Sequence, residues 1–451
     1  MGTLEQKIKA FVKDQGVEVV GVAGPDRLDG PPSLDPTYTM RGARSIVTMA
    51  LPMNVDAIYD FLGKKSPAPH NVDQYKLNQK LNWITTSVAN YISSLGYRAK
   101  AVAANGNYRR SLNTFAVYPS FSHRCGAIVS GIAAQGWSGN VMSKEYGASM
   151  YLGTIVTDAR LESDEPMHPR FFIDNYCKNC KLCERTCVAG MFEPEREEYL
   201  LINKELHPRG RRVNLDICST SCFGLHALSR DKKWTTWGDR WIKEWVDHSP
   251  GASDSKLKNR YIMMREVLSG GDTATRYDFI RNVGHNLLPK KVIEDYANKH
   301  PENKREIERT KMLFDFAGQI GISGLRNERI LTCGQCSLVC GPTLEETAKR
   351  YKTLIESGLV VPGPEGEMVN VTTYEEAVEK RKKYLPEFSG VEKLKNAVAF
   401  GIYWTKHYTG IEPKSIIKGM IYKRRLKKAI QDRVRGPADS VEEAAKKRTI
   451  P

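Results

Sequence analysis

Two runs of cysteines have the spacing that iron–sulfur clusters require of their ligands. The first run reads Cys-x2-Cys-x2-Cys-x3-Cys, and a second run, much later in the chain, reads Cys-x2-Cys-x3-Cys. Three thiolates at the shorter spacing can wrap three corners of one [4Fe–4S] cubane, and the fourth cysteine of such a run serves the other cubane. The pattern therefore predicts two [4Fe–4S] clusters that need both runs. The residues are Cys177, Cys180, Cys183 and Cys187 in the first run and Cys333, Cys336 and Cys340 in the second.

A count of thiolates extends this prediction. Two cubanes with four thiolate ligands each need one cysteine more than the two runs contain. The remaining ligand is Cys218 or Cys222. With Cys218 in that role, the predicted sets are Cys177, Cys180, Cys183 and Cys340 for one cluster, and Cys187, Cys218, Cys333 and Cys336 for the other. Cys125 and Cys222 are then left over.

Zinc and disulfides are the ordinary alternatives for clustered cysteines, and both fit less well. Structural zinc sites usually combine two separate cysteine pairs, whereas the first run has three cysteines in succession at the shorter spacing. Disulfides would require an oxidising compartment, and the N-terminal sequence contains neither an apolar secretory core nor a twin-arginine pair. We therefore expect cluster ligands and a cytoplasmic protein.

Composition gives broader limits. The length of 451 residues predicts two or three domains, and an apolar share of 41% suffices for ordinary buried cores. The net charge of +16 favours an acidic partner such as nucleic acid, anionic lipid or an acidic electron donor, although it also serves solubility alone. No apolar run approaches the roughly 20 residues of a membrane-spanning helix. We expect a globular protein in the cytoplasm or at a membrane surface.

Residues 1–165 show alternating helix and strand patterns. Apolar residues recur at helical spacing over 4–14 and 75–95. Short apolar runs typical of strands occupy 19–22, 45–51, 99–104 and 153–157. The alternation predicts an α/β domain built on a layered sheet, and the whole chain is expected to be α+β.

The cysteines lie in residues 166–222 and 326–345, which predict a two-cluster module of the bacterial-ferredoxin type. The segment between them, 223–325, is charged and is predicted to be a helical insertion. Four tryptophans at helical spacing place their indoles on one face, as core, as an interface or as a stacking platform. They are Trp234, Trp237, Trp241 and Trp245.

Residues 346–451 are predicted to form a basic helical extension with a Gly/Pro-rich turn at 361–366. Within it, 414–435 combines apolar residues with many lysines and arginines at helical spacing, which is typical of an amphipathic cationic helix. Such a helix could rest on a membrane surface, bind an acidic partner or expose a solvated face.

Clusters transfer electrons but rarely transform substrates. The sequence therefore predicts either a second, catalytic cofactor in residues 1–165 or a pure electron carrier. Generic motifs do not identify that cofactor, because neither a dinucleotide fingerprint at a strand-to-helix turn nor a triphosphate-binding loop occurs.

The stretch 122–161 resembles the block that precedes the clusters in reductive dehalogenases and epoxyqueuosine reductases, which are cobalamin enzymes. The shared pattern is a helix end of small residues, a glycine with a following asparagine, a Tyr-Gly turn and a strand that ends in Thr-Asp-x-x-Leu. Here these are Ser130–Ala133, Gly136 to Asn140, Tyr146–Ala148 and Thr157–Leu161. The resemblance also includes Tyr75, Tyr97 and both cysteine runs, and so covers roughly residues 1–222 and 326–345.

This resemblance implies a nitroreductase-like domain that holds cobalamin without a protein histidine on cobalt. Phe121 stands where the aspartate of an Asp-x-His-x-x-Gly corrinoid motif would precede His123, so His123 is expected to be a pocket residue. The resemblance also favours Cys218 over Cys222 as the eighth cluster ligand, because Cys218 takes the position of the family's lone cysteine. The implied corrinoid-binding residues are Tyr97, His123, Gly136, Ser138, Asn140, Tyr146 and Gly147.

The implied activity is a reduction. Two clusters would receive electrons from a low-potential donor such as ferredoxin or flavodoxin and pass them singly to cobalamin, which reduces a small organic molecule, an organohalide for instance. Bond cleavage then requires a proton donor within hydrogen-bond reach. The resemblance puts Tyr75 in this role.

Two departures from the families' patterns bear on the substrate. Tyr151 stands where many dehalogenases have an arginine, and 116–120 lacks the Asp-Ser/Thr-Ala-Pro motif of epoxyqueuosine reductases. Three hypotheses follow: a dehalogenase-like reductase as the main one, a transfer-RNA-modifying reductase of the epoxyqueuosine type, and an iron–sulfur electron-transfer subunit without corrinoid.

Overall fold

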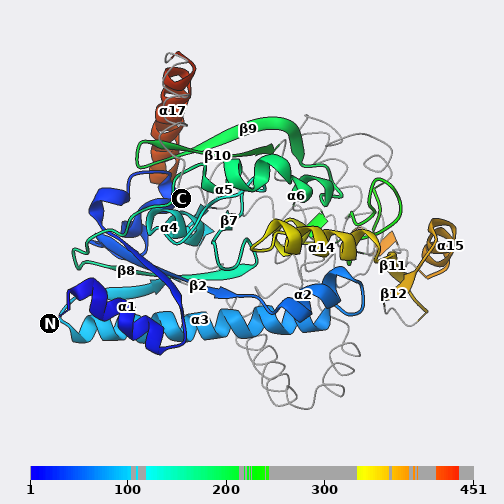
Figure 1. The fold of residues 1–451 in the computed structure, drawn as a ribbon, viewed down its shortest axis with the longest axis horizontal. Coiled ribbons are helices and arrows are strands. Elements are labelled where there is room, and N and C mark those ends of the chain that lie inside the picture. Colours follow the sequence, from blue (N-terminus) through cyan, green and yellow to red (C-terminus); the bar gives the residue numbers. More distant parts are fainter. Residues whose placement is uncertain are drawn as a thin grey trace.

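The computed structural model describes residues 2–102, 108–109, 118–212, 218, 221–222, 224, 226–238, 240–242, 333–364, 368–384, 390–391, 394 and 413–435. The side chains of 75, 108–109, 118, 413–416 and 435 are left aside, and all structural observations refer to the described residues. A long helix runs along one edge of the molecule, and the basic helix near the C-terminus projects from the opposite edge (Figure 1).

A four-stranded sheet forms the centre of the N-terminal part. Its strands are β1 (Val19–Ala23), β2 (Ser45–Pro52), β8 (Met150–Thr157) and β3 (Ala99–Val102), in that order across the sheet. The strands lie where the apolar runs predict them. All neighbouring pairs are antiparallel, however, so this domain is itself α+β and not an alternating parallel α/β unit.

The two faces of the sheet are covered by different helices, because successive side chains of a strand point to opposite faces. Val47 and Met49 of β2 pack with α1 (Leu4–Asp14) and α3 (Ala68–Ser94). Ile46 and Ala50 pack on the other face with α4 (His123–Val129). The layered sheet and the helices predicted over 4–14 and 75–95 are confirmed.

Local sequence explains where the first helices begin. Thr3 and Gln6 form a reciprocal capping box at the start of α1. The Asn54 side chain accepts a hydrogen bond from the Ala57 N–H at the start of α2 (Val55–Leu62). The short elements are η1 (Pro25–Arg27), η2 (Pro32–Leu34), η3 (Pro36–Tyr38), β4 (Tyr108–Arg109), β5 (Tyr118–Pro119), β6 (Ala134–Gln135), β7 (Val141–Met142), α5 (Phe171–Asn175), η4 (Cys177–Asn179), α6 (Leu182–Arg185) and α13 (Gln335–Leu338).

A long antiparallel hairpin, β9 (Phe192–Ile202) with β10 (Glu205–Arg212), follows the first cysteine run and was not predicted. Its turn residues Asn203 and Lys204 both have positive φ, 49° and 66°, as a two-residue hairpin turn of the primed type requires. The asparagine was an available signal for this turn. Many charged residues in β9 hide the alternation that identifies a strand.

The C-terminal region is mixed. It contains α14 (Leu344–Ile355), β11 (Leu359–Pro362), β12 (Met368–Val371), α15 (Tyr374–Tyr384) and α17 (Pro413–Arg435). The prediction of a purely helical extension over 346–451 is wrong, because β11 and β12 pair as an antiparallel hairpin. The cationic helix predicted over 414–435 is confirmed as α17.

The tryptophans do not lie on a helical face. The described residues from 226 to 242 contain no helix, and Leu228 pairs with Thr235 in an isolated bridge. Trp234 and Trp237 are buried in a core with α2 and α14, whereas Trp241 stacks on the ring of Tyr374. The core role is therefore confirmed for two indoles and the helical arrangement is wrong, because long-range packing overrides the spacing. Trp245 and 243–325 lie outside the described residues.

None of the described helices is both long and apolar enough to cross a membrane.

Candidate iron–sulfur centre

Two apolar clusters bring the distant cysteine runs together. In the first, Val188, which follows Cys187, packs with Leu338 and Val339, which precede Cys340. In the second, Cys183 and Cys340 both lie against a core of Trp137, Met142, Ala148, Phe172, Ile173 and Cys177. Burial of this apolar surface, at roughly 25 cal/mol per Å2, holds segments that are far apart in sequence.

The first predicted ligand set surrounds one cavity. Its lining includes Cys177, Cys180, Cys183 and Cys340, together with Trp137, Ser138, Met142 and Lys181. The Trp137 backbone N–H donates to the Cys177 sulfur at 3.4 Å. Such hydrogen bonds stabilise a thiolate and tune the potential of a cluster. A cavity bounded by four thiols from both runs fits a [4Fe–4S] cubane.

The second predicted set also converges. Burial raises the pKa of the Cys187 thiol, and its neighbours Cys218, Cys333 and Cys336 raise it further. The Met191 N–H donates to the Cys187 sulfur at 3.3 Å. Because a protonated thiol is a poor ligand, these buried groups need the positive charge of iron to exist as thiolates.

The two thiol groups are neighbours. Burial raises the pKa of the Cys183 thiol well above its usual value, with added contributions from Cys340, Cys177 and Cys336, the last of which belongs to the second group. Among the described residues, no three His, Cys, Asp or Glu side chains gather tightly enough to hold a single ion. A cubane is larger, and each of its iron corners takes one thiolate.

Cys222 joins the second group, although the sequence left it over. Its sulfur lies 3.9 Å from that of Cys218. Hydrogen bonding from Cys222 lowers the pKa of Cys218 to about 7 and also lowers the pKa of Cys333. The pKa of Cys222 itself rises well above its usual value, first because of its hydrogen bonds to those two sulfurs. Cys125 lies elsewhere, on the buried face of α4.

Both sulfurs lie beside the second group, and the resemblance assigns Cys218 as the eighth ligand. Cys218→Ser is therefore expected to remove or convert the second cluster. Cys222→Ser keeps a hydrogen-bond donor and is expected to retain full iron content. Iron analysis and electron paramagnetic resonance of the reduced proteins test this, and a loss confined to Cys222→Ser would reverse the assignment.

The loop between β6 and β8 lies against the thiols and carries five of the predicted corrinoid residues. Asn140 Nδ2 lies 3.6 Å from the Cys336 sulfur, and Ser138 lines the first cavity. Gly136 donates its N–H to the Asn140 carbonyl at 2.9 Å and closes the β6–β7 turn. Gly147 contacts the Cys340 backbone, and Tyr146 packs on the core beside α4. The structure thus places this loop beside the cluster ligands.

The other two predicted corrinoid residues, His123 and Tyr97, and the predicted proton donor Tyr75 come from outside this loop. His123 begins α4, and its Nδ1 lies 2.9 Å from Thr154 Oγ1 on β8. Tyr97 is 40% exposed beyond the C-terminal end of α3. Tyr75 is near the other end of α3, roughly 30 Å away at 1.5 Å per residue, and its side chain lies outside the described residues. These residues do not line one described cavity, so the corrinoid site stays a prediction of the resemblance.

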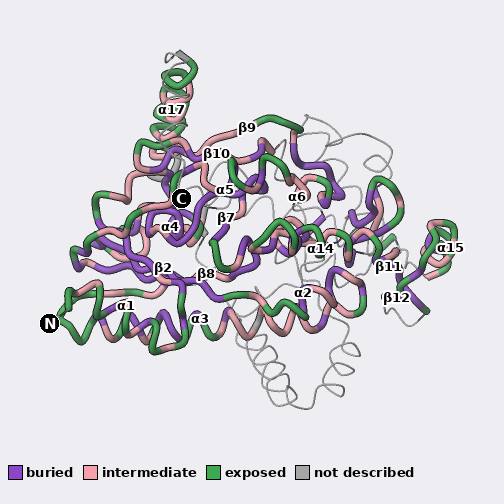
Figure 2. Tube along the Cα trace, viewed as in Figure 1, coloured by how far each residue is buried: buried purple, intermediate pink, exposed green. Residues whose placement is uncertain are grey.

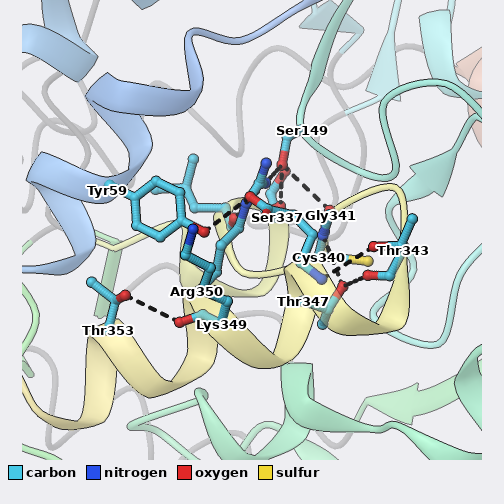
Figure 3. A network of polar contacts seen from close by, with 12 residues as sticks. Tyr59, Ser149, Ser337, Cys340, Gly341, Thr343, Thr347, Lys349, Arg350 and Thr353 are labelled. Carbon is cyan, nitrogen blue, oxygen red and sulfur yellow. Dashed lines mark hydrogen bonds and ion pairs between the residues drawn. The ribbon is translucent and has the colours of Figure 1, made fainter.

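A buried arginine network holds the second cysteine run in place, and sequence reasoning missed it (Figure 3). Arg350 on α14 is 2% exposed. Its Nη1 donates to Ser149 Oγ at 2.7 Å and to the Leu338 carbonyl at 3.1 Å, and its Nε donates to Glu346 at 2.7 Å. Ser149 Oγ in turn donates to the Cys340 carbonyl at 3.3 Å. The guanidinium therefore fixes the loop that supplies Cys340.

Gly147 lies so close to the Cys340 loop that a larger side chain would clash with it. Its φ is +60°, and a Cβ there would lie 2.3 Å from the Gly341 carbonyl oxygen. Gly147→Ala is expected to destabilise the protein by roughly 2–5 kcal/mol, from backbone strain and the clash together. Gly16→Ala is the matched control, because Gly16 has φ +78° and nothing near its Cβ position. Equal melting temperatures for the two variants would show that the close approach is not required.

Comparisons with known proteins support the resemblance. No family model matches the chain. Over 312 residues, the chain is 24% identical to an epoxyqueuosine reductase of Gloeobacter violaceus, a match that covers 57% of this chain and 89% of the relative.

Solved structures give weaker likenesses. A reductive dehalogenase matches at 14% identity over 48% of this chain and 28% of that chain, with a TM-score of 0.36. The epoxyqueuosine reductase of Streptococcus thermophilus matches at 19% identity over 41% of this chain and 52% of that chain, with a TM-score of 0.29. An epoxyqueuosine reductase with a modified tRNA stem loop matches at 14% identity over 89% of this chain and 98% of that chain, with a TM-score of 0.34. These scores are low, so the relation depends on the sequence match. The chain is thus similar to epoxyqueuosine reductases, within the superfamily that its motifs predict, and the match supports an oxidoreductase.

Proposed function

We propose that this chain is a reductase that moves single electrons through two adjacent [4Fe–4S] clusters. The observation that carries the proposal is the convergence of both cysteine runs on two neighbouring groups of thiols, one of them around a cavity. Adjacent clusters suit stepwise transfer of single electrons from a low-potential donor such as ferredoxin or flavodoxin.

Cobalamin is the catalytic cofactor that the resemblance implies, and when bound it would supply a cobalt centre able to reduce an organic substrate. The chain's own groups would supply protons. Tyr75 on α3 remains the proposed proton donor, and His123, hydrogen-bonded to Thr154, would be a pocket residue.

For the substrate, we place a modified nucleoside of transfer RNA ahead of an organohalide. The similar protein of Gloeobacter violaceus is an epoxyqueuosine reductase by name, and the net charge of +16 suits a polyanion. The missing acid motif at 116–120 means that the proton must come from a different residue than in that family.

An anaerobic preparation tests the proposal. We expect about eight irons and eight sulfides per chain together with corrin absorption bands and one cobalt. Transfer RNA is expected to bind with an affinity that falls steeply as salt rises, because phosphate contacts release counterions. A full iron content without corrin absorption bands would indicate an electron-transfer subunit that holds no corrinoid. Corrin with turnover of organohalides and no binding of transfer RNA would favour the dehalogenase.

A further inference from the structure

Helix α17 uses only one of its faces to dock on the body of the protein. Lys418 and Arg425 form ion pairs with Asp35 and Asp29. The Tyr422 hydroxyl oxygen accepts a hydrogen bond from the Leu201 N–H of β9 at 2.9 Å. Because residues three or four apart lie on the same side of a helix, these contacts define a single docked face.

The face of α17 next to the docked face exposes an apolar patch. Ile417, Met420 and Ile421 are 59%, 54% and 52% exposed, and their spacing of three and four residues makes them neighbours. One and two turns further along the same face are Arg424, Lys427 and Lys428, all exposed. The exposed surface of the helix is visible in Figure 2, where it projects beyond the body.

We propose that this face of α17 binds an anionic membrane surface, a role beyond the reductase function. An amphipathic helix with apolar side chains flanked by lysine and arginine lies in the headgroup region of anionic bilayers, where both kinds of side chain are satisfied. RNA would pair with the cations but would leave the isoleucines and the methionine in water. Charge complementarity together with the apolar patch therefore favours lipid over nucleic acid.

The protein can bind a membrane in this way without rearrangement, because docking of α17 and the apolar patch use different side chains. The ion pairs with Asp29 and Asp35 and the Tyr422 hydrogen bond use side chains that are not on the exposed face. Helix α17 projects from the body (Figure 1), and the side chains of the patch are exposed, so a bilayer can reach them. The protein would thus be a peripheral membrane protein, attached through a helix that stays docked.

Co-sedimentation of the holoenzyme with phosphatidylglycerol/phosphatidylcholine vesicles tests this proposal. The protein is expected to bind these vesicles, with an affinity that falls as salt rises. Its affinity for vesicles of phosphatidylcholine alone should be at least tenfold weaker. Ile417→Ser combined with Ile421→Ser is expected to weaken binding at least tenfold. Lys427→Ser combined with Lys428→Ser is expected to weaken it and to reduce its salt dependence.

The matched control is Val378→Ser, which removes an exposed apolar side chain from α15 and should bind vesicles like the parent. Circular dichroism and iron content verify that each variant is folded, and reductase activity in solution should not change. Parent-like vesicle binding by the isoleucine variant would overturn the proposal. The proposal would also be overturned if a transfer RNA stem loop displaced the protein from vesicles and only the lysine variant failed to bind that stem loop. A dimer in sedimentation velocity that the isoleucine variant abolishes would overturn it too.

Discussion

Cys183→Ser is expected to remove the first cluster and to lower the iron content from about eight to about four per chain. Cys183 lines the cavity shared with Cys177, Cys180 and Cys340, and no other described cysteine lines it. Loss of one thiolate therefore leaves an iron corner without its ligand. Iron and sulfide analysis on anaerobic protein gives the measurement, and electron paramagnetic resonance should show that one of two reduced signals has disappeared.

Cys125→Ser is the matched control for that experiment. Cys125 is a buried thiol on the core-facing side of α4, apart from both ligand sets, so this variant should keep about eight irons. Unchanged iron in Cys183→Ser, or iron loss in Cys125→Ser, would contradict the ligand assignment.

Arg350→Met is expected to disturb the first cluster while the second remains. The variant removes the guanidinium that donates to Ser149 Oγ, to the Leu338 carbonyl and to Glu346. Glu346 keeps the hydrogen bond from the Tyr59 hydroxyl, whereas Ser149 Oγ and the Leu338 carbonyl lose this buried donor. The expected loss of stability is roughly 2–4 kcal/mol, a value that allows for the partial exposure of Glu346. A displaced Cys340 loop should shift the reduction potential and the signal of the first cluster.

Two comparisons separate this positioning role from general destabilisation. Lys352→Met changes an exposed cation on the same helix and should leave both clusters and the melting temperature unchanged. Arg350→Lys keeps the charge but not the forked donor geometry, and should restore the signal of the first cluster only in part. Equal shifts in both clusters for Arg350→Met would show that the network does not act through Cys340.

The candidate centre could be predicted from sequence only as far as local spacing determines it. Cysteines separated by two residues can present their sulfurs to one cluster, and apolar runs such as 45–51 and 153–157 are typical of strands. Contacts over long sequence distances gave no comparable signal. Arg350 resembles an ordinary surface residue of an amphipathic helix, and the spacing of Trp234, Trp237 and Trp241 suggested a helix where none exists among the described residues.

The sequence by itself therefore predicted two sets of cluster ligands, and it determined the four strands of the central sheet and the helices α1, α3 and α17, since each depends on spacing within a short segment. Only the tertiary structure decided that Cys222 is hydrogen-bonded to Cys333, that Gly147 lies against the Cys340 loop, and that Arg350 anchors that loop. The physical reason is that these contacts join segments brought together by burial of apolar surface, and such burial leaves no periodicity in the sequence that would reveal its partners.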